Sequence, residues 1–264
     1  MKRLEPVLTQ ALFAPLNAQL VALLRGLSAE EWDRPTVAGA WTVKDVAAHL
    51  LDSAMRRLSM HRDGYVPPLA PAEDLAAFVN GLNAEGVNYA RRLSPGLLVD
   101  LLERYGAAQA TFFESLDPFG EAKWSVSWAG EERSPTWFDV ARELTERWHH
   151  QQQIRDATGR PPLYTGYLAP VLATFVRALP FTYRDVAAPD GTAIVFRLDE
   201  EAWSLVREGS WTLYAGEASD PAARVTLRGD RAWRLFTRQR IEPEATVEGE
   251  ARLAEPFLHM VAII

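Results

Sequence analysis

Two stretches that lie far apart in the chain decide its interpretation: Trp41-Thr-Val-Lys-Asp-Val-Ala-Ala-His49-Leu50 and Glu146-Arg-Trp-His-His150-Gln-Gln-Gln-Ile-Arg-Asp-Ala157. Each stretch predicts a helix. Thr42 is a suitable N-cap for the first helix, and Gly159 followed by prolines ends the second. Together the two helices offer two imidazoles and one carboxylate. A catalytic divalent ion uses this number of protein ligands when it keeps one position open for substrate.

The spacing within the second stretch supports a metal site. Glu146 and His150 are four residues apart, so their side chains lie on one helix face and can reach a common ion. His149 is three residues from Glu146 and could replace His150 as the ligand. Gln153 lies one turn further along this face and could orient a ligand or substrate. His49 lies on a polar edge of its own helix, and helical bundles build metal sites from such facing side chains. The alternative is that all of these residues lie on solvated faces.

Composition limits the classes of function. The chain has 264 residues, of which 48% are hydrophobic and 24% charged, as in a folded protein with a filled core. Its formal net charge of -7 argues against a broad nucleic-acid-binding surface. No apolar run approaches the roughly 20 residues that span a bilayer, and the first residues lack a signal-peptide pattern. We therefore expect a cytoplasmic protein with no nucleic acid partner and no membrane partner.

The chain contains no cysteine. This excludes disulfides, thiolate metal ligands and a cysteine nucleophile. Any metal site must be built from His, Asp, Glu and water, and any thiol chemistry must use a thiol that arrives with a cofactor.

The pattern of apolar residues changes near residue 162. Before it, helical spacing predicts helices over residues 10–27, 42–58, 71–92, 95–116 and 136–158. After it, β-branched and aromatic runs predict strands over residues 193–198, 210–214, 223–227 and 245–248, with helices over 168–179 and 231–237. We therefore expect two domains, a helical one over 1–162 and a smaller α+β one over 163–264.

The two stretches also resemble known motifs. The first is similar to the signature GW-[ST]-V-x-D-x-x-A-H-L of the DinB-like superfamily, and in particular of the mycothiol-dependent maleylpyruvate isomerase family. The second resembles that family's motif E-x-x-x-H-x-x-D-I-R-x-A-x-G. The resemblance implies a DinB-like up-and-down four-helix bundle followed by a sterol-carrier-like α+β domain. It also implies the metal ligands His49, Glu146 and His150. Where the motif has an aspartate, this chain has Gln153.

The C-terminal region adds a candidate catalytic residue. The family often has a glycine-arginine pair near Thr237-Arg238, and here the glycine is missing. An arginine facing the metal could bind a substrate carboxylate through a bidentate pair of hydrogen bonds. Arg238 is the first candidate and Arg240 the second, and the alternative is that both are solvated surface residues. Trp124 and Trp128 precede the second ligand-bearing helix and could line a cleft.

The resemblance implies a divalent-metal-dependent enzyme that uses a low-molecular-weight thiol, such as mycothiol, as nucleophile. It would be an isomerase if the thiol leaves again and an S-transferase if it stays on a small-molecule substrate. Zn²⁺ suits two histidines and a carboxylate, and Ni²⁺, Fe²⁺ or Mn²⁺ are further possibilities. One alternative is a non-catalytic metal-containing protein that binds a small apolar ligand, and another is a hydrolase that uses metal-bound water. The chain could be a monomer or a homodimer.

Overall fold

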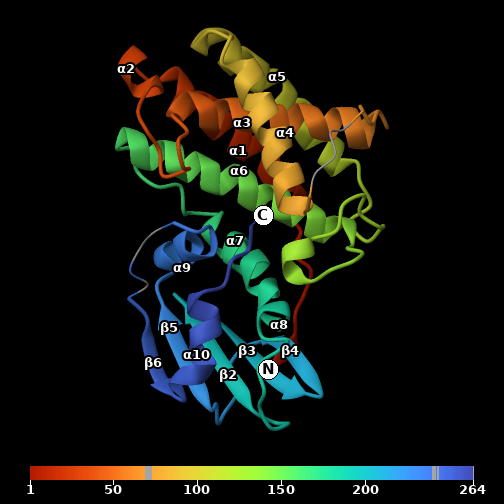
Figure 1. Cartoon of the computed structure of the whole chain (residues 1–264), viewed down its shortest axis with the longest axis vertical. Helices are drawn as coiled ribbons and strands as arrows, with labels where there is room; N and C mark the ends of the chain where they lie inside the picture. The colour runs from red at the N-terminus through yellow and green to blue at the C-terminus, as the bar shows by residue number, and fades with distance from the viewer. Residues whose placement is uncertain (69–72, 240–241, 243, 264) are drawn as a thin grey trace.

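The computed structural model describes residues 1–68, 73–239, 242 and 244–263. Its N-terminal part is helical, as Figure 1 shows. Four helices pack around one another: α1 (Phe13–Arg25), α3 (Val43–Arg57), α5 (Pro95–Glu114) and α6 (Thr136–Thr158). The short helix α2 (Ala29–Trp32) follows α1, and α4 (Leu75–Ala90) packs on the outside of α3. None of the described helices is long and apolar enough to cross a bilayer.

Local signals set the ends of the helices that matter for the site. The Thr42 hydroxyl accepts a hydrogen bond from the backbone of Asp45, and the Asp45 carboxylate accepts one from the backbone of Thr42, so α3 begins with a capping box. Helix α6 ends at Gly159, whose φ of 66° is the left-handed conformation that glycine adopts easily. The predicted bounds of α6 are confirmed.

The C-terminal part contains a mixed six-stranded sheet with the strand order β1-β4-β3-β2-β5-β6. Strands β2 and β5 are parallel, and the other neighbours are antiparallel. The strands are β1 (Lys2–Arg3), β2 (Ala193–Leu198), β3 (Glu201–Glu208), β4 (Ser210–Ala215), β5 (Ala223–Leu227) and β6 (Thr246–Gly249). The helices are α7 (Leu168–Phe175), α8 (Leu179–Thr182), α9 (Gly229–Phe236) and α10 (Ala251–Leu258). The predicted combination of a helical part with an α+β part is confirmed.

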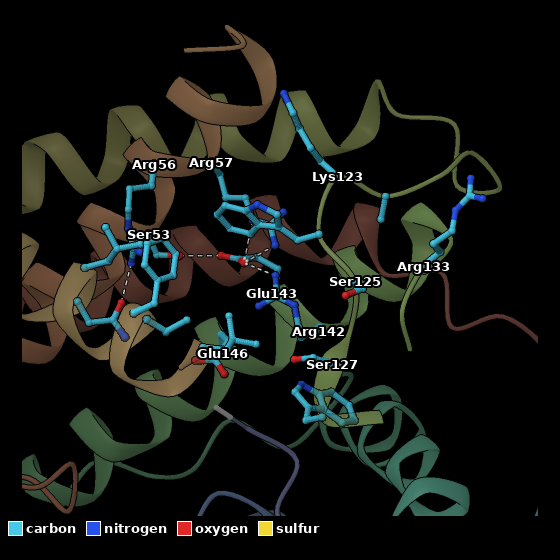
Figure 2. Close-up of a pocket in the computed structure, with 18 of the residues that line it drawn as sticks. Ser53, Arg56, Arg57, Lys123, Ser125, Ser127, Arg133, Arg142, Glu143 and Glu146 are labelled. Carbon is cyan, nitrogen blue, oxygen red and sulfur yellow. Dashed lines mark hydrogen bonds and ion pairs between the residues drawn. The ribbon is translucent and has the colours of Figure 1, made fainter. Parts of the chain in front are cut away.

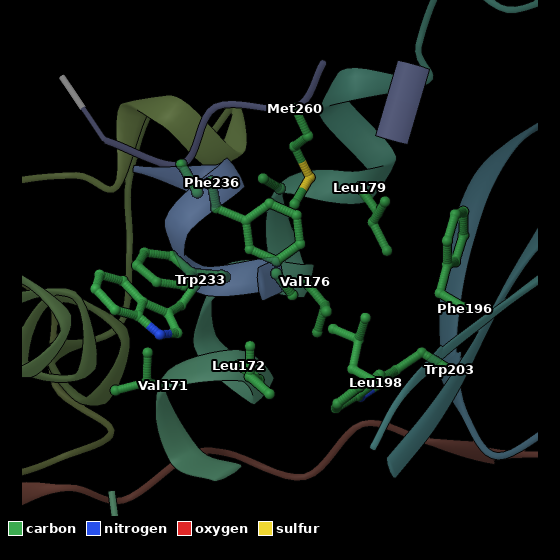
Figure 3. Packing of buried hydrophobic residues seen from close by; sticks show 14 of the residues in the cluster. Val171, Leu172, Val176, Leu179, Phe196, Leu198, Trp203, Trp233, Phe236 and Met260 are labelled. Atoms are coloured by element: carbon green, nitrogen blue, oxygen red, sulfur yellow. The ribbon is translucent and has the colours of Figure 1, made fainter. Parts of the chain in front are cut away.

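One hydrophobic core runs through both parts. Helices α7 and α9 lie between the sheet and α6 (Figure 1). The Trp148 ring of α6 meets the Trp233 ring of α9 edge to face, with 5.1 Å between ring centroids. Trp233 and Phe236 continue into the cluster that reaches Leu198 and Trp203 of the sheet (Figure 3). The division at residue 162 stays a prediction, since this core and the pairing of β1 with β4 both join the two parts.

The sequence patterns missed three elements. Strand β3 was not predicted, because its apolar residues Trp203, Leu205 and Val206 are few, Ser204 interrupts them, and charged residues flank them. Strand β1 has two residues, too few for a periodic signal, and α10 contains a proline. The predicted helix over 168–179 is divided into α7, a 3-10 turn over Val176–Ala178 and the start of α8. The predicted helix over 71–92 corresponds to α4, and its first two residues lie outside the described residues.

Candidate metal centre and adjacent cavity

Helices α3 and α6 bring the three predicted ligands together. His49 comes from α3, and Glu146 and His150 come from α6. One ligand atom from each residue can be chosen so that all three atoms lie within 4.8 Å of one another. The imidazole rings of His49 and His150 are edge to face, with 4.7 Å between their centroids. His150 Nε2 lies 3.6 Å from a carboxylate oxygen of Glu146.

The surroundings of the two histidines fit metal ligands. Gln153 Oε1 lies 2.8 Å from His150 Nδ1. Since a carbonyl oxygen can only accept, Nδ1 carries the proton and Nε2 has a free lone pair toward Glu146. His49 Nδ1 is buried and has no hydrogen-bond partner among the described residues. The Trp41 ring packs 5.1 Å from the His49 ring. Two imidazoles, one of which has an unpaired buried nitrogen, and a carboxylate form a donor set that suits a divalent first-row metal.

The third histidine lies outside this set. His149 is buried, and its Nδ1 lies 2.9 Å from the backbone oxygen of Thr145, one turn earlier in α6. Burial first, and then the neighbouring His150, lower the pKa of His149 to about 4. The open alternative that His149 replaces His150 therefore lacks support from the geometry.

Electrostatics favour the ligand forms of these side chains. Burial, together with the nearby His150, lowers the pKa of His49 well below its ordinary value, so its ring is neutral at pH 7. Burial alone would raise the pKa of Glu146, but the surrounding imidazoles outweigh it and lower that pKa. A neutral imidazole and an ionised carboxylate are the forms that bind a metal ion.

A cavity of about 450 Å³ adjoins this site (Figure 2). His49 and Glu146 line it, together with residues of α3, α4, α6 and the segment 121–133. Trp124 and Trp128 are both in its wall, which confirms the prediction that they line a cleft. Every described lining residue lies between positions 49 and 146, so the described wall comes from the helical part.

A buried ionic network forms the floor of this cavity, and sequence reasoning missed it. Arg57 donates hydrogen bonds to both carboxylate oxygens of Asp139, at 2.7 and 2.8 Å. It also donates to Glu143 at 3.1 Å (Figure 2). Arg142 also donates to Asp139, at 2.7 Å, and Ser53 donates to Glu143 at 2.8 Å. Burial opposes the charged forms, but the guanidinium groups prevail and lower the pKa of both carboxyls. The only sequence signal was the polar edge that follows His49.

The structure places Arg238 away from this cavity wall. Arg238 is exposed, its φ is 59°, and it is not among the residues that line the cavity. Its neighbour Arg234 instead pairs with Asp156 of α6, with one nitrogen-oxygen distance of 3.0 Å. Arg240, the second candidate, lies outside the described residues. A catalytic role for Arg238 stays a prediction.

The fold and the site define a class of two-part proteins: a helical bundle that presents two histidines and a glutamate beside a cavity, joined to an α+β part. The chain belongs to the family of the mycothiol maleylpyruvate isomerase N-terminal domain, whose model matches residues 13–155. No curated protein sequence matches the chain significantly.

Two solved structures are similar to the whole chain. One is a mycothiol-dependent maleylpyruvate isomerase, with 17% sequence identity and a TM-score of 0.58. The other is a histidine-to-alanine mutant of a protein of the same name, with 16% identity and a TM-score of 0.57. Each comparison covers 93% of this chain and 95% of the other. At this identity the likeness shows a shared fold, and the family membership supports a thiol-dependent enzyme of the isomerase type.

Proposed function

We propose that this protein is a divalent-metal-dependent enzyme that uses a low-molecular-weight thiol such as mycothiol as nucleophile. Its substrate is a small electrophile, and the reaction is an isomerisation or an S-transfer. One observation carries the proposal: His49, Glu146 and His150 lie together, and His49 and Glu146 also line a cavity, in a chain that has no cysteine of its own. Membership of a family named for mycothiol dependence supports it.

The chain's own residues have distinct roles in this proposal. His49, Glu146 and His150 would hold the metal, with Zn²⁺ favoured over Ni²⁺, Fe²⁺ or Mn²⁺ by the donor set. When bound, the ion supplies the positive charge that lowers the pKa of a coordinating thiol. Gln153 fixes the ring of His150 by accepting its Nδ1 proton. Trp124 contributes an aromatic surface to the cavity wall.

The fate of the thiol decides the class of reaction. A thiolate that adds to an electrophilic carbon of a conjugated alkene leaves a single bond that can rotate. Loss of the thiol then restores the alkene as its geometric isomer and regenerates the cosubstrate. If the thiol instead stays on the carbon, the product is a thioether and the reaction is an S-transfer. Both outcomes need the same binding residues.

The first experiment measures metal content by elemental mass spectrometry on tag-free protein. We expect one equivalent of a divalent metal in the wild type and loss of this metal in His49→Ala and His150→Ala. The second part follows turnover of maleylpyruvate with and without mycothiol. Turnover that needs both metal and thiol supports the proposal. A protein that stays metal-free after incubation with Zn²⁺, Ni²⁺ and Mn²⁺ contradicts it, and metal-dependent turnover without thiol indicates a hydrolase instead.

The role predicted for Arg238 has its own test. If its guanidinium binds a substrate carboxylate, Arg238→Ala raises KM for a carboxylate substrate and leaves metal content unchanged. An unchanged KM in Arg238→Ala contradicts that role.

A further inference from the structure

One wall of the cavity is an apolar face of α4. Leu75, Phe78, Val79 and Leu82 all line the cavity, at the spacing that places them on one side of a helix. Leu75 is 51% exposed, and the other three are partly exposed. Only Val87 and Ala90, at the far end of α4, are buried. This apolar face therefore borders open space that a ligand can fill, whereas an ordinary core helix would have covered it with protein.

Two tryptophans add aromatic surface to the cavity. Trp124 and Trp128 come from the segment between α5 and α6. The Trp124 ring lies 4.7 Å from the Arg57 guanidinium and 4.2 Å from the His61 ring, so it is held in place. An apolar or aromatic body in this cavity would lie against rigid aromatic surface and an aliphatic helix face.

The cationic side chains in the wall already have partners. Arg57 and Arg142 are bound to Asp139 and Glu143. Arg133 binds Glu121, with Nε 2.7 Å from a carboxylate oxygen.

The two remaining cations of the described wall are also engaged. Arg56 Nε forms an ion pair at 2.7 Å with Asp52, although without hydrogen-bond geometry, and Arg56 Nη2 donates to Asn83. The Lys123 ammonium donates to the backbone oxygen of Met60 at 2.9 Å. Each of the four guanidinium groups of the described wall pairs with a carboxylate, so a dianionic ligand would have to compete with those carboxylates for them. The Lys123 ammonium has a neutral backbone oxygen as its partner and keeps two further N–H donors.

The serine hydroxyls of the wall differ in whether they can donate a hydrogen bond to a ligand. The Ser53 hydroxyl gives its proton to Glu143, so it presents only lone pairs to the cavity. Ser125 and Ser127 also line the cavity (Figure 2). Their hydroxyls can donate to one carbonyl oxygen without any net charge.

We propose that the electrophilic substrate is an uncharged, conjugated carbonyl compound with an apolar body of about the size of a phenyl ring. Its body packs between the α4 face and Trp124, and the hydroxyls of Ser125 and Ser127 bind its carbonyl oxygen. This assignment rests on the proposed function for the reaction at the site. It differs from the small dianionic substrate in the name of the similar solved enzymes.

The test compares two probes by calorimetry on the full-length protein, with no thiol present. One probe is 4-phenylbut-3-en-2-one, an uncharged conjugated ketone with a phenyl body, and the other is maleate. We expect the ketone to bind at least tenfold more tightly than maleate. Repeating the titrations on wild-type protein treated with EDTA removes any binding of maleate through a metal ion and should leave ketone binding unchanged. Maleate binding as tight as that of the ketone in the EDTA-treated protein would overturn the assignment.

Variants of α4 locate the bound ketone. Phe78→Ala and Leu82→Ala should each weaken ketone binding roughly three- to tenfold, as the loss of an aromatic or aliphatic contact does. Tyr89→Ala is the matched control, because Tyr89 is on the same helix, 64% exposed and outside the cavity wall. Thermal melting checks that all three variants fold. Folded Phe78→Ala and Leu82→Ala proteins with unchanged ketone affinity would contradict the assignment.

The two proposals fail in different experiments. Ketone binding without thiol-dependent turnover of either the ketone or maleylpyruvate leaves the cavity assignment standing and removes the proposed function. Thiol-dependent turnover in a protein that binds maleate more tightly than the ketone supports the proposed function and removes the cavity assignment.

Discussion

Gln153 Oε1 lies 2.8 Å from Nδ1 of His150, so a neutral amide takes the place at which the family motif has an aspartate. The amide oxygen accepts the same proton that a carboxylate would accept, and it holds the imidazole in the same orientation. It lacks the negative charge that makes the opposite nitrogen more basic. As a metal ligand, a histidine held in this way would keep its orientation and would donate less electron density to the ion.

This pairing predicts the effect of Gln153 on metal affinity. Gln153→Leu removes the acceptor with little change in volume, and we expect metal affinity to fall about 10- to 100-fold, as for other residues that hold a ligand histidine. Gln153→Glu restores an acceptor of the same length and should bind metal at least as well as wild type. Competition with a chromogenic chelator measures both. Equal affinities in Gln153→Leu and wild type would show that the hydrogen bond has no role.

Substitutions of the two adjacent histidines, His149 and His150, should show which of them binds the metal. We expect His149→Gln to keep one equivalent of metal, because the His149 ring is bound to the Thr145 carbonyl and lies outside the ligand set. His150→Gln should lose the metal. Elemental mass spectrometry on the two variants shows which histidine the metal needs. Loss of metal in His149→Gln alone would mean that His149, and not His150, is the ligand.

The buried network predicts a large loss of stability. Arg57→Met leaves Asp139 and Glu143 buried without their main cation, and breaking a buried pair in this way costs about 3–5 kcal/mol. Urea unfolding measures the change. Arg25→Met is the control, since Arg25 pairs with Glu103 on the surface and its loss should have no measurable effect. Similar midpoints for the two variants would contradict the prediction.

His61 should make the protein sensitive to acid. Its Nδ1 lies 2.9 Å from Nη1 of Arg57 and accepts a hydrogen bond from that guanidinium group. Burial, and then Arg57, lower the pKa of His61 to about 4, although Asp139 and Glu143 oppose this and Lys123 adds to it. The unfolded chain takes up this proton at a pH of about 6.5.

This lowered pKa sets the direction of the effect. The neutral ring contributes stability that is present above about pH 6.5 and is lost as the pH falls toward 4, because the unfolded state binds the proton first. His61→Gln should therefore lose less stability than wild type between pH 7 and pH 4.5. Urea midpoints at these two pH values provide the measurement. Equal losses of stability in wild type and His61→Gln would mean that His61 does not titrate between pH 7 and pH 4.5.

Local signals explain how much of this structure could be predicted from the sequence. The N-cap Thr42 marks the start of α3, and Gly159 marks the end of α6, so the helices that carry His49, Glu146 and His150 were predicted closely. The spacing of Glu146 and His150 within one helix could also be read directly. That His49 joins them depended on the resemblance, since no local rule states which helices face each other.

Long-range partners could not be predicted in the same way. Arg57 meets Asp139 across two helices, and a single sequence does not show which of its many arginines is buried against which carboxylate. The helix α4 was predicted, but only the packing shows that one of its faces borders a cavity. Strand β3 depends on its neighbours β2 and β4 for its hydrogen bonds, and its own residues form a weak pattern.

The pairing of Lys2 and Arg3 with Tyr214 and Ala215 has a consequence for how the two parts can be separated. The chain enters the sheet first, leaves it to form all the helices of the bundle, and then returns to complete the sheet. In topological terms the bundle is an insertion within the α+β part, and the helices that carry His49, Glu146 and His150 lie inside that insertion. Cutting the chain at a single point after α6 would therefore leave an edge strand attached to the wrong fragment, so the two parts are not independent modules that can be exchanged by one junction.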